Sequence, residues 1–235
     1  MDLTKFSTIE EVKKEQKGII LIDKDQDWTS HDVVAKLRRI VGVKKIGHAG
    51  TLDPLATGLL IILVGREFTK LQDQFMKQDK EYEVEAEFGI TTDSYDAMGE
   101  IVTQLGWDAV SKITKDDLNE AMIKLTGEIE QTVPAYSAVK VKGKKLYQKA
   151  RKGDIDLSSL PSRIVNIYNF ELIEFNKDVQ NKKVTAKFYT KVSSGTYIRS
   201  LIHDLGQLLQ VGAYVTQLRR VSIGNARVDR AEQIE

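Results

Sequence analysis

The segment GHAGTLDPLATG, residues 47–58, is the most informative stretch of this chain. It places one imidazole, His48, and one carboxylate, Asp53, among three glycines. Glycine permits backbone angles that other residues avoid, and Pro54 fixes its own φ directly after the acid. Because an ordinary helix end needs only one glycine, we predict a loop that presents Asp53. The apolar run at 59–64 predicts a buried strand immediately after it.

Two interpretations of Asp53 are open from the residues alone. An aspartate before proline in a loop rich in glycine and threonine often forms a turn or caps a helix. Loops on rigid scaffolds also carry functional residues, which favours a catalytic Asp53. The segment lacks the Lys-Ser/Thr ending of a phosphate-binding loop and the GxGxxG spacing, which argues against nucleotide binding.

Helical patterns recur along the chain. Ser30 is expected to cap a helix that ends at Gly42. Thr114, with Asp117 three residues later, predicts the start of another helix. Helical spacing also covers 196–209, but a glycine inside that stretch, Gly206, argues against an unbroken helix.

Strand patterns lie between these helices. Residues 18–23 form a compact apolar run, and period-two alternation predicts strands at 82–88, 163–175 and 184–192. Because strands and helices do not alternate strictly, we predict an α+β fold with a mixed, mostly antiparallel central sheet flanked by helices.

Composition excludes several classes of protein. The chain has 235 residues, a net charge of +1 and 41% hydrophobic residues, which fits a globular protein with a large core. It has no cysteine, which excludes disulfides and thiolate metal sites and is compatible with the cytoplasm. No pair of histidines has metal-ligand spacing, so no metal site is expected. No apolar run reaches the length of a membrane span, and no signal peptide is recognisable, so no membrane partner is expected.

A basic segment at 140–152 suggests a nucleic-acid partner. It contains no acidic residue and carries a series of lysines, of which Lys140, Lys142, Lys144 and Lys145 are candidate RNA contacts. Tyr136 and Tyr147 lie beside or inside the segment, which suits phosphate contacts combined with stacking on exposed bases. The alternative is a solvated helix face followed by a hairpin tip.

The loop at 47–58 resembles the catalytic motif of the TruB-type tRNA pseudouridine synthases, the bacterial tRNA pseudouridine-55 synthase family. Further motifs of that family match in the same order. They are DK at 23–24 with WTSHDVV at 28–34, KEYEV at 80–84, VPAYSAVK at 133–140, SGTYIRSL at 194–201 and LRR at 218–220. Together they span most of the chain, so the resemblance implies the pseudouridine synthase fold.

The resemblance also implies the reaction. Members of this family isomerise a uridine in the T loop of tRNA, position 55, to pseudouridine. The base is flipped out of the RNA, detached from its sugar, rotated and rejoined through C5, which is a C-glycoside rearrangement. Because nothing is oxidised and no group is added, no cofactor is expected. The expected partner is the T arm of tRNA, and no obligate protein partner is evident.

The resemblance assigns roles to particular residues. Asp53 is the catalytic carboxylate, whether it attacks the sugar, attacks the base or assists glycal formation. Arg199 matches the arginine that pairs with that aspartate, and a buried guanidinium stays charged. Four further residues match substrate-binding positions: His48, which stacks within the T loop, Tyr82, which stacks on the target base, and Tyr197 and Leu218, which line the pocket.

The chain departs from the family in two places. Asp25 and Asp27 stand where relatives usually have a proline and a glycine, and Lys24, directly before them, is a candidate RNA contact. The chain also ends where the catalytic domain of the family ends. We therefore predict an N-terminal arm at 1–17, a catalytic domain at 18–235, and no small C-terminal RNA-binding domain of the kind found in many relatives.

A second function fits the same features. The basic segment is also compatible with a tRNA-binding or tRNA-folding module whose role does not depend on catalysis. Replacing Asp53 separates the two functions, because only the enzyme needs that carboxylate.

Overall fold

The computed structural model describes residues 5–234 apart from 138, 142, 151–155 and 157–158. The chain forms two units, a first unit of Met1–Glu83 with Leu218–Glu235 and a second unit of Val84–Gln217. Two strands, β4 (Lys80–Phe88) and β12 (Ala213–Ile223), each contribute residues to both units.

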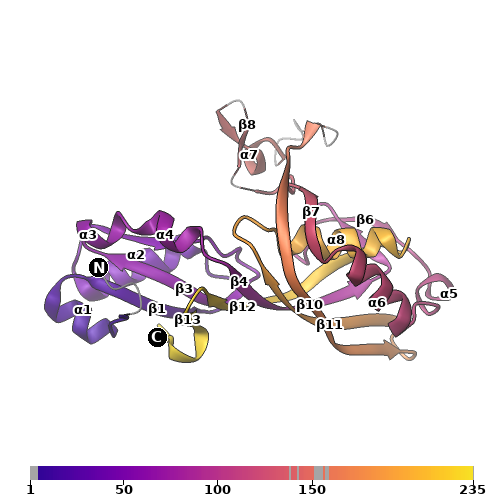
Figure 1. Ribbon diagram of the computed structural model, residues 1–235, viewed down its shortest axis with the longest axis horizontal. Helices are drawn as coiled ribbons and strands as arrows, with labels where there is room; N and C mark the ends of the chain where they lie inside the picture. Colours follow the sequence, from indigo (N-terminus) through magenta and orange to yellow (C-terminus); the bar gives the residue numbers. More distant parts are fainter. Residues whose placement is uncertain (1–4, 138, 142, 151–155, 157–158, 235) are drawn as a thin grey trace. The chain divides into compact units, whose positions relative to one another are not determined.

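The first unit combines short helices with a small sheet (Figure 1). Its helices are α1 (Ile9–Glu15), α2 (Ser30–Val41), α3 (Arg66–Thr69), α4 (Gln72–Met76) and the 3-10 helix η2 (Val228–Arg230). Its strands are β1 (Gly18–Lys24), β2 (Ile46–Ala49), β3 (Thr57–Val64) and β13 (Ala226–Arg227), with the ends of β4 and β12.

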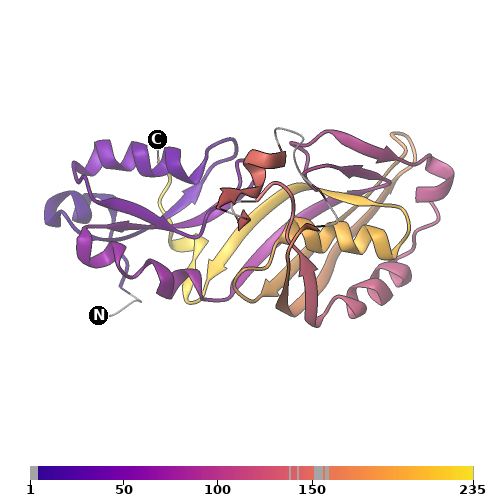
Figure 2. The ribbon, with the colours of Figure 1, turned by 90° about the horizontal axis from the view of Figure 1, so that it is seen from above.

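Strand β3 forms the centre of the first unit. It pairs antiparallel with β1 and β2 and parallel with β12. Leu59, Ile61 and Leu63 join Phe75 of α4 in one apolar cluster, while the alternate residues of β3 face the other side. Figure 2 shows α2 on one side of these strands and α3 and α4 on the other. A strand covered on both faces is apolar throughout, which is why the run at 59–64 carries no alternation.

Helix α2 begins at Ser30, one residue earlier than it would if Ser30 were its N-cap. Thr29 is the N-cap, and its side chain and that of Asp32 exchange capping bonds with the backbone. Gly42 ends the helix with φ +71°, a left-handed conformation that glycine adopts without strain. The expected end is therefore confirmed, and the expected cap at Ser30 is wrong, because the hydroxyl of Ser30 bonds elsewhere.

The second unit combines a long antiparallel sheet with two main helices. Its strands are β5 (Ile90–Thr92), β6 (Ile101–Gln104), β7 (Gly127–Thr132), β8 (Lys140–Val141), β9 (Lys144–Lys145), β10 (Ser162–Asp178) and β11 (Lys183–Val192), with parts of β4 and β12. Its helices are α5 (Trp107–Val110), α6 (Lys115–Lys124), α7 (Leu146–Ala150) and α8 (Ile198–Leu208). The predicted Thr114–Asp117 capping pair is confirmed at the start of α6.

The two faces of the second unit's sheet differ in chemistry. Helices α6 and α8 contact each other and cover one face through β10 and β7 (Figure 1 and Figure 2). Lysines and glutamates form ion pairs across the other, including Lys183–Glu87 at 3.0 Å and Lys187–Glu174 at 3.5 Å. One apolar and one solvated face is the usual arrangement of an antiparallel sheet, and it explains the period-two alternation in the sequence.

Gly206 lies within α8 without breaking it. A Cβ at this position would come within 2.3 Å of the backbone nitrogen of Ala213 and 2.5 Å of the carbonyl carbon of Gly212. The glycine therefore permits β12 to begin directly against the helix, and the sequence-based argument against an unbroken helix is wrong.

The strands follow the order β1-β3-β12-β4-β11-β10-β7 in one nine-stranded sheet, to which β2 and β13 are also paired. Apart from the parallel β3–β12 pairing, the pairings described here are antiparallel, which confirms the predicted mixed, mostly antiparallel α+β fold. Across the described residues, no helix has the length and apolar character needed to span a membrane.

Candidate active site

The loop between β2 and β3 holds Asp53 between two anchors. Leu52 and Leu55 are 4% and 5% exposed, whereas Asp53 between them is only partly buried. The carbonyl of Asp53 accepts a hydrogen bond from the amide of Ala56 at 3.0 Å, which closes a tight turn. Two buried leucines thus fix the loop to the core of the first unit on both sides of Asp53.

Ser30 fastens the loop to helix α2. Its hydroxyl accepts a hydrogen bond from the amide of Leu52 at 2.8 Å and lies 3.1 Å from the carbonyl of the same residue, to which it donates. Both bonds are buried, so they are worth more than exposed ones. They fix the residue directly before Asp53.

Lys24 fastens the same loop from the end of β1. It is 1% exposed, and its ammonium donates to the carbonyls of Asp25 at 2.8 Å, Trp28 at 2.7 Å and Pro54 at 3.5 Å. Burial lowers the pKa of Lys24 to about 8, against the opposing charges of Asp25 and Asp53. The structure gives this ammonium carbonyl partners inside the protein, and its contact with RNA stays a prediction.

Lys24 and a second buried lysine, Lys80, make the stability depend on pH. Lys80 is 7% exposed, and burial lowers its pKa to about 8 as well. In the unfolded chain both lysines titrate near 10.5, so between about pH 8 and pH 10 the unfolded state binds more protons. We expect the free energy of unfolding to rise from pH 7.5 to pH 9.5.

Urea unfolding at several pH values measures this rise. The variant Lys80→Met should show about half of it, since one of the two groups is removed. A stability that is constant over this range in the unaltered protein would contradict the assignment.

Arg220 and Tyr82 lie in the same unit as Asp53. Arg220 is 1% exposed and donates to the carbonyls of Leu59 at 2.8 Å and Gly50 at 3.0 Å. Burial lowers the pKa of Arg220, while a side-chain hydrogen bond with Tyr82 and the charge of Asp53 favour its charged form. The ring of Tyr82, on β4, is buried, as is Leu218 on β12.

His48 lies on β2 and is partly buried. Burial lowers its pKa, and the positive charge of Arg220 lowers it further, so the imidazole is neutral at physiological pH. Its Nδ1 atom is buried and lacks a hydrogen-bond partner among the described residues. A neutral ring suits stacking better than ion pairing.

Arg199 lies in the second unit, in the first turn of α8. It is 4% exposed and donates to the carbonyls of Ser94 at 2.6 Å and Tyr136 at 2.9 Å. Its Nε atom is 3.5 Å from the carboxylate of Asp96, which is 5% exposed. The guanidinium is therefore fixed in place within its own unit, and its predicted pairing with Asp53 stays a prediction.

Tyr197 precedes Arg199 as the N-cap residue of α8. The side-chain amide of Gln131, which is 0% exposed, brackets it by accepting from its backbone amide at 2.8 Å and donating to its carbonyl at 3.1 Å. The guanidinium of Arg163 lies over the Tyr197 ring, 5.2 Å from its centroid. Gln131 thus holds the backbone at the start of α8, and Arg163 covers the ring of its N-cap residue.

The basic segment is described only in part. Lys140 begins the two-residue strand β8, and Lys144 and Lys145 form β9, which pairs with it. Lys142 lies outside the described residues. A hairpin backbone fits the alternative of a hairpin tip, and the RNA contacts of all four lysines stay predictions.

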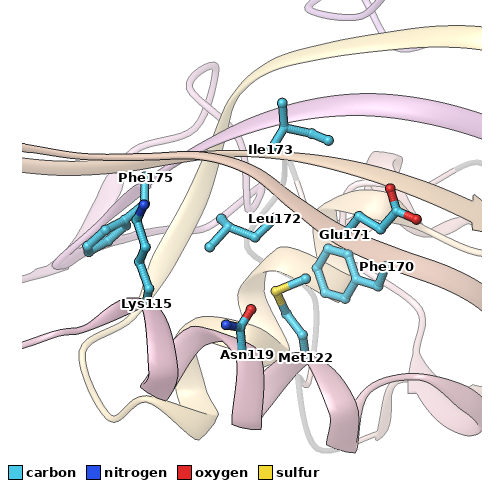
Figure 3. A pocket seen from close by; sticks show the side chains of 8 residues that line it. All are labelled: Lys115, Asn119, Met122, Phe170, Glu171, Leu172, Ile173 and Phe175. Atoms are coloured by element: carbon cyan, nitrogen blue, oxygen red, sulfur yellow. The ribbon is translucent and has the colours of Figure 1, made fainter.

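A pocket of about 580 Å³ lies between α6 and β10 of the second unit, and Figure 3 shows its side chains. Its lining includes Lys115, Asn119 and Met122 from α6 and Phe170, Leu172 and Phe175 from β10. None of the residues predicted from the sequence lines it, so it takes no part in the candidate site.

Four residues that fix candidate site residues within their own units were not predicted as site residues: Ser30 and Arg220 in the first unit, Asp96 and Gln131 in the second. Their partners lie 22 to 170 residues away in the chain or are backbone atoms, which local spacing does not reveal. Arg220 alone carried a signal, because an arginine between Arg219 and the apolar Val221 of a strand is costly to bury without partners.

Comparison with known proteins identifies the family. The family model described as TruB family pseudouridylate synthase (N terminal domain) matches residues 38–198. The chain belongs to the TruB family. The model described as tRNA pseudouridylate synthase B C-terminal domain matches residues 199–235. The division into an arm and a catalytic domain stays a prediction.

Curated members of the TruB family are similar over most of the chain. The tRNA pseudouridine synthase B of Chlamydia muridarum is 43% identical over 215 residues, which are 91% of this chain and 83% of the relative. That of Protochlamydia amoebophila is 45% identical over 210 residues, 88% and 74% of the two chains. These relatives confirm the predicted activity, the isomerisation of uridine in tRNA.

Solved structures confirm the pseudouridine synthase fold. A chain of a Cbf5-Nop10-Gar1 complex matches with a TM-score of 0.68 and 29% identity, over 97% of this chain and 55% of that one. A chain of an archaeal box H/ACA sRNP Nop10-Cbf5 complex matches with a TM-score of 0.65 and 26% identity, over 97% and 54%. This chain thus spans about half the length of these structural neighbours.

Proposed function

We propose that this TruB-family chain converts the uridine at position 55, in the T loop of tRNA, to pseudouridine, and that it acts in the cytoplasm on the T arm without a cofactor or an obligate protein partner. The observation that carries the proposal is the Asp53 loop, which Ser30, Lys24 and Arg220 fasten at separate backbone atoms. A loop held at this many points presents one carboxylate in one place, which is what a single-carboxylate reaction requires.

The proposed reaction breaks the bond between N1 of uracil and C1′ of the ribose, rotates the base, and forms a bond between C5 and C1′. The proton on C5 is then lost, and N1, freed from the sugar, takes up a proton, so the product is an isomer of the substrate. Asp53 is the group that acts on the substrate, as a nucleophile or by stabilising positive charge on the sugar. A sugar that carries positive charge is stabilised by a negative charge close to it.

The other proposed contacts receive the flipped nucleotide. Extrusion of the uridine exposes its faces, and Tyr82 is proposed to stack on the base beside the apolar Leu218. Neutral His48 is proposed to stack within the T loop. Tyr197 and Arg199 are proposed as substrate-side residues from the second unit, with Arg199 keeping Asp53 ionised.

Mapping of pseudouridine in bulk tRNA from cells that lack this chain tests the proposal. Loss of the T-loop pseudouridine alone, restored by the unaltered gene, is expected. Loss at another position, or no loss, would contradict the proposed target.

A tRNA-binding or tRNA-folding role is the second candidate, and the basic segment at 140–152 favours it. The variant Asp53→Asn distinguishes the two roles in the same cells. Normal tRNA folding without the modified base indicates that the two roles coexist, whereas a folding defect that this variant does not rescue assigns the whole effect to catalysis.

A further inference from the structure

Arg220 is among the largest fully buried side chains of the first unit and carries a charge. Taking a guanidinium out of water costs several kcal/mol unless its donors are satisfied. Its neighbour Arg219 is different, since it forms a two-pronged ion pair with Asp23, at 2.9 and 2.6 Å, and is 37% exposed. Of these two adjacent arginines, Arg219 therefore pairs with Asp23 and stays partly exposed, whereas the side chain of Arg220 is directed into the protein.

The donors of Arg220 reach both ends of the Asp53 loop. Nη2 donates to the carbonyl of Gly50 at 3.0 Å, and Nη1 lies 3.5 Å from the carbonyl of Thr51, both ahead of Asp53. Nε donates to the carbonyl of Leu59, just behind the loop, at 2.8 Å. A planar, forked guanidinium presents its donors in one plane at fixed angles, so it can hold several carbonyls in a defined arrangement.

The backbone of Arg220 also holds the end of the loop. Gly58, the second residue of β3, directly after the loop, has φ +98°, and a Cβ there would lie 2.3 Å from the carbonyl oxygen of Arg220. Gly58 pairs with Arg220 where β12 runs beside β3. The close approach that only glycine permits fixes the distance between Arg220 and the loop.

The same side chain connects the loop to Tyr82. The Tyr82 side chain and the charge of Asp53 both favour the charged form of the Arg220 guanidinium, against the larger effect of burial on its pKa. One rigid group thus bonds to the loop before Asp53 and to the strand after it, and interacts electrostatically with the tyrosine proposed to stack on the base.

We propose that Arg220 is a positioning residue of the isomerisation, which sets the place of Asp53 relative to the side chain of Tyr82 without touching the substrate. This inference rests on the proposed role of Asp53. It predicts that loss of the fork slows the chemical step and leaves the affinity for tRNA unchanged, because no RNA contact is removed.

The test uses Arg220→Met, Arg220→Lys and the control Arg227→Met, which removes an exposed arginine paired with Glu81 at 3.6 Å. The single-turnover rate is measured as tritium release from tRNA labelled at C5 of uridine, and the dissociation constant for tRNA by filter binding. For Arg220→Met we expect a rate about 100-fold lower, a dissociation constant changed less than about threefold, and a smaller loss for Arg220→Lys, since misplacement of about 1 Å has effects of this size. Arg227→Met should match the unaltered protein.

Hydrogen exchange of the loop amides at 50–58 gives a readout that does not need activity. Faster exchange in Arg220→Met, confined to this loop, supports the positioning role. An unchanged rate in a folded Arg220 variant would overturn the inference. A rate and an affinity that fall together with the folded fraction, or loss of folding by both Arg220 variants, would also overturn it. If the unaltered protein releases no tritium, the proposed function fails, and the exchange data still report whether Arg220 holds the loop.

Discussion

Replacing Asp53 with asparagine should reduce tritium release from C5-labelled tRNA by about a thousandfold or more, the range seen when a group that acts on the substrate is lost. Asparagine has nearly the same shape, and the bonds that hold the loop involve backbone atoms of Leu52, Pro54 and Ala56. The fold and the affinity for tRNA should therefore remain, so the loss falls on the chemical step.

The control for this variant is Asp73→Asn, which makes the same change on the exposed surface of α4. It should keep full activity. The result that would contradict the role of Asp53 is turnover by Asp53→Asn at a rate close to that of Asp73→Asn.

The variant Asp53→Asn should also change the pKa of the neighbouring Lys24. The carboxylate raises the pKa of Lys24, against the larger effect of burial. In Asp53→Asn the pKa of Lys24 should fall further below about 8, as measured by NMR titration of labelled lysine. No change would contradict the effect of Asp53 on Lys24.

The elements that could be predicted from the sequence are those whose signals are local. The buried strand at 59–64 was visible as an apolar run, and the capping pair at Thr114 and Asp117 as a spacing of three. The loop that carries Asp53 was visible because glycine and proline mark unusual backbone. Each of these signals lies within about ten residues.

What could not be predicted depends on distant contacts. Ser30 resembles a helix cap, yet its hydroxyl bonds to Leu52, 22 residues away. Gly206 resembles a helix breaker, yet α8 continues through it. The missing Cβ leaves room for the backbone at the start of β12. The site residues that act through backbone atoms far along the chain, Arg220 above all, become visible only when the strands are paired.

The second large effect is expected for Arg199→Met. Asp96 is 5% exposed, and this change removes the arginine beside it, 3.5 Å away, together with donors to Ser94 and Tyr136. Breaking a buried ion pair from one side costs about 3–5 kcal/mol, because the remaining charge is left without its partner. We expect this loss in the free energy of unfolding, and loss of turnover as well if Arg199 keeps Asp53 ionised.

The double variant Arg199→Met with Asp96→Asn separates the effect of Arg199 on stability from its effect on turnover. The double variant should regain part of the stability, because no carboxylate is then left buried beside an apolar side chain, but it should regain none of the turnover. Thermal unfolding and tritium release measure the two quantities on the same samples. Turnover that returns together with stability would show that Arg199 acts only by holding the second unit together.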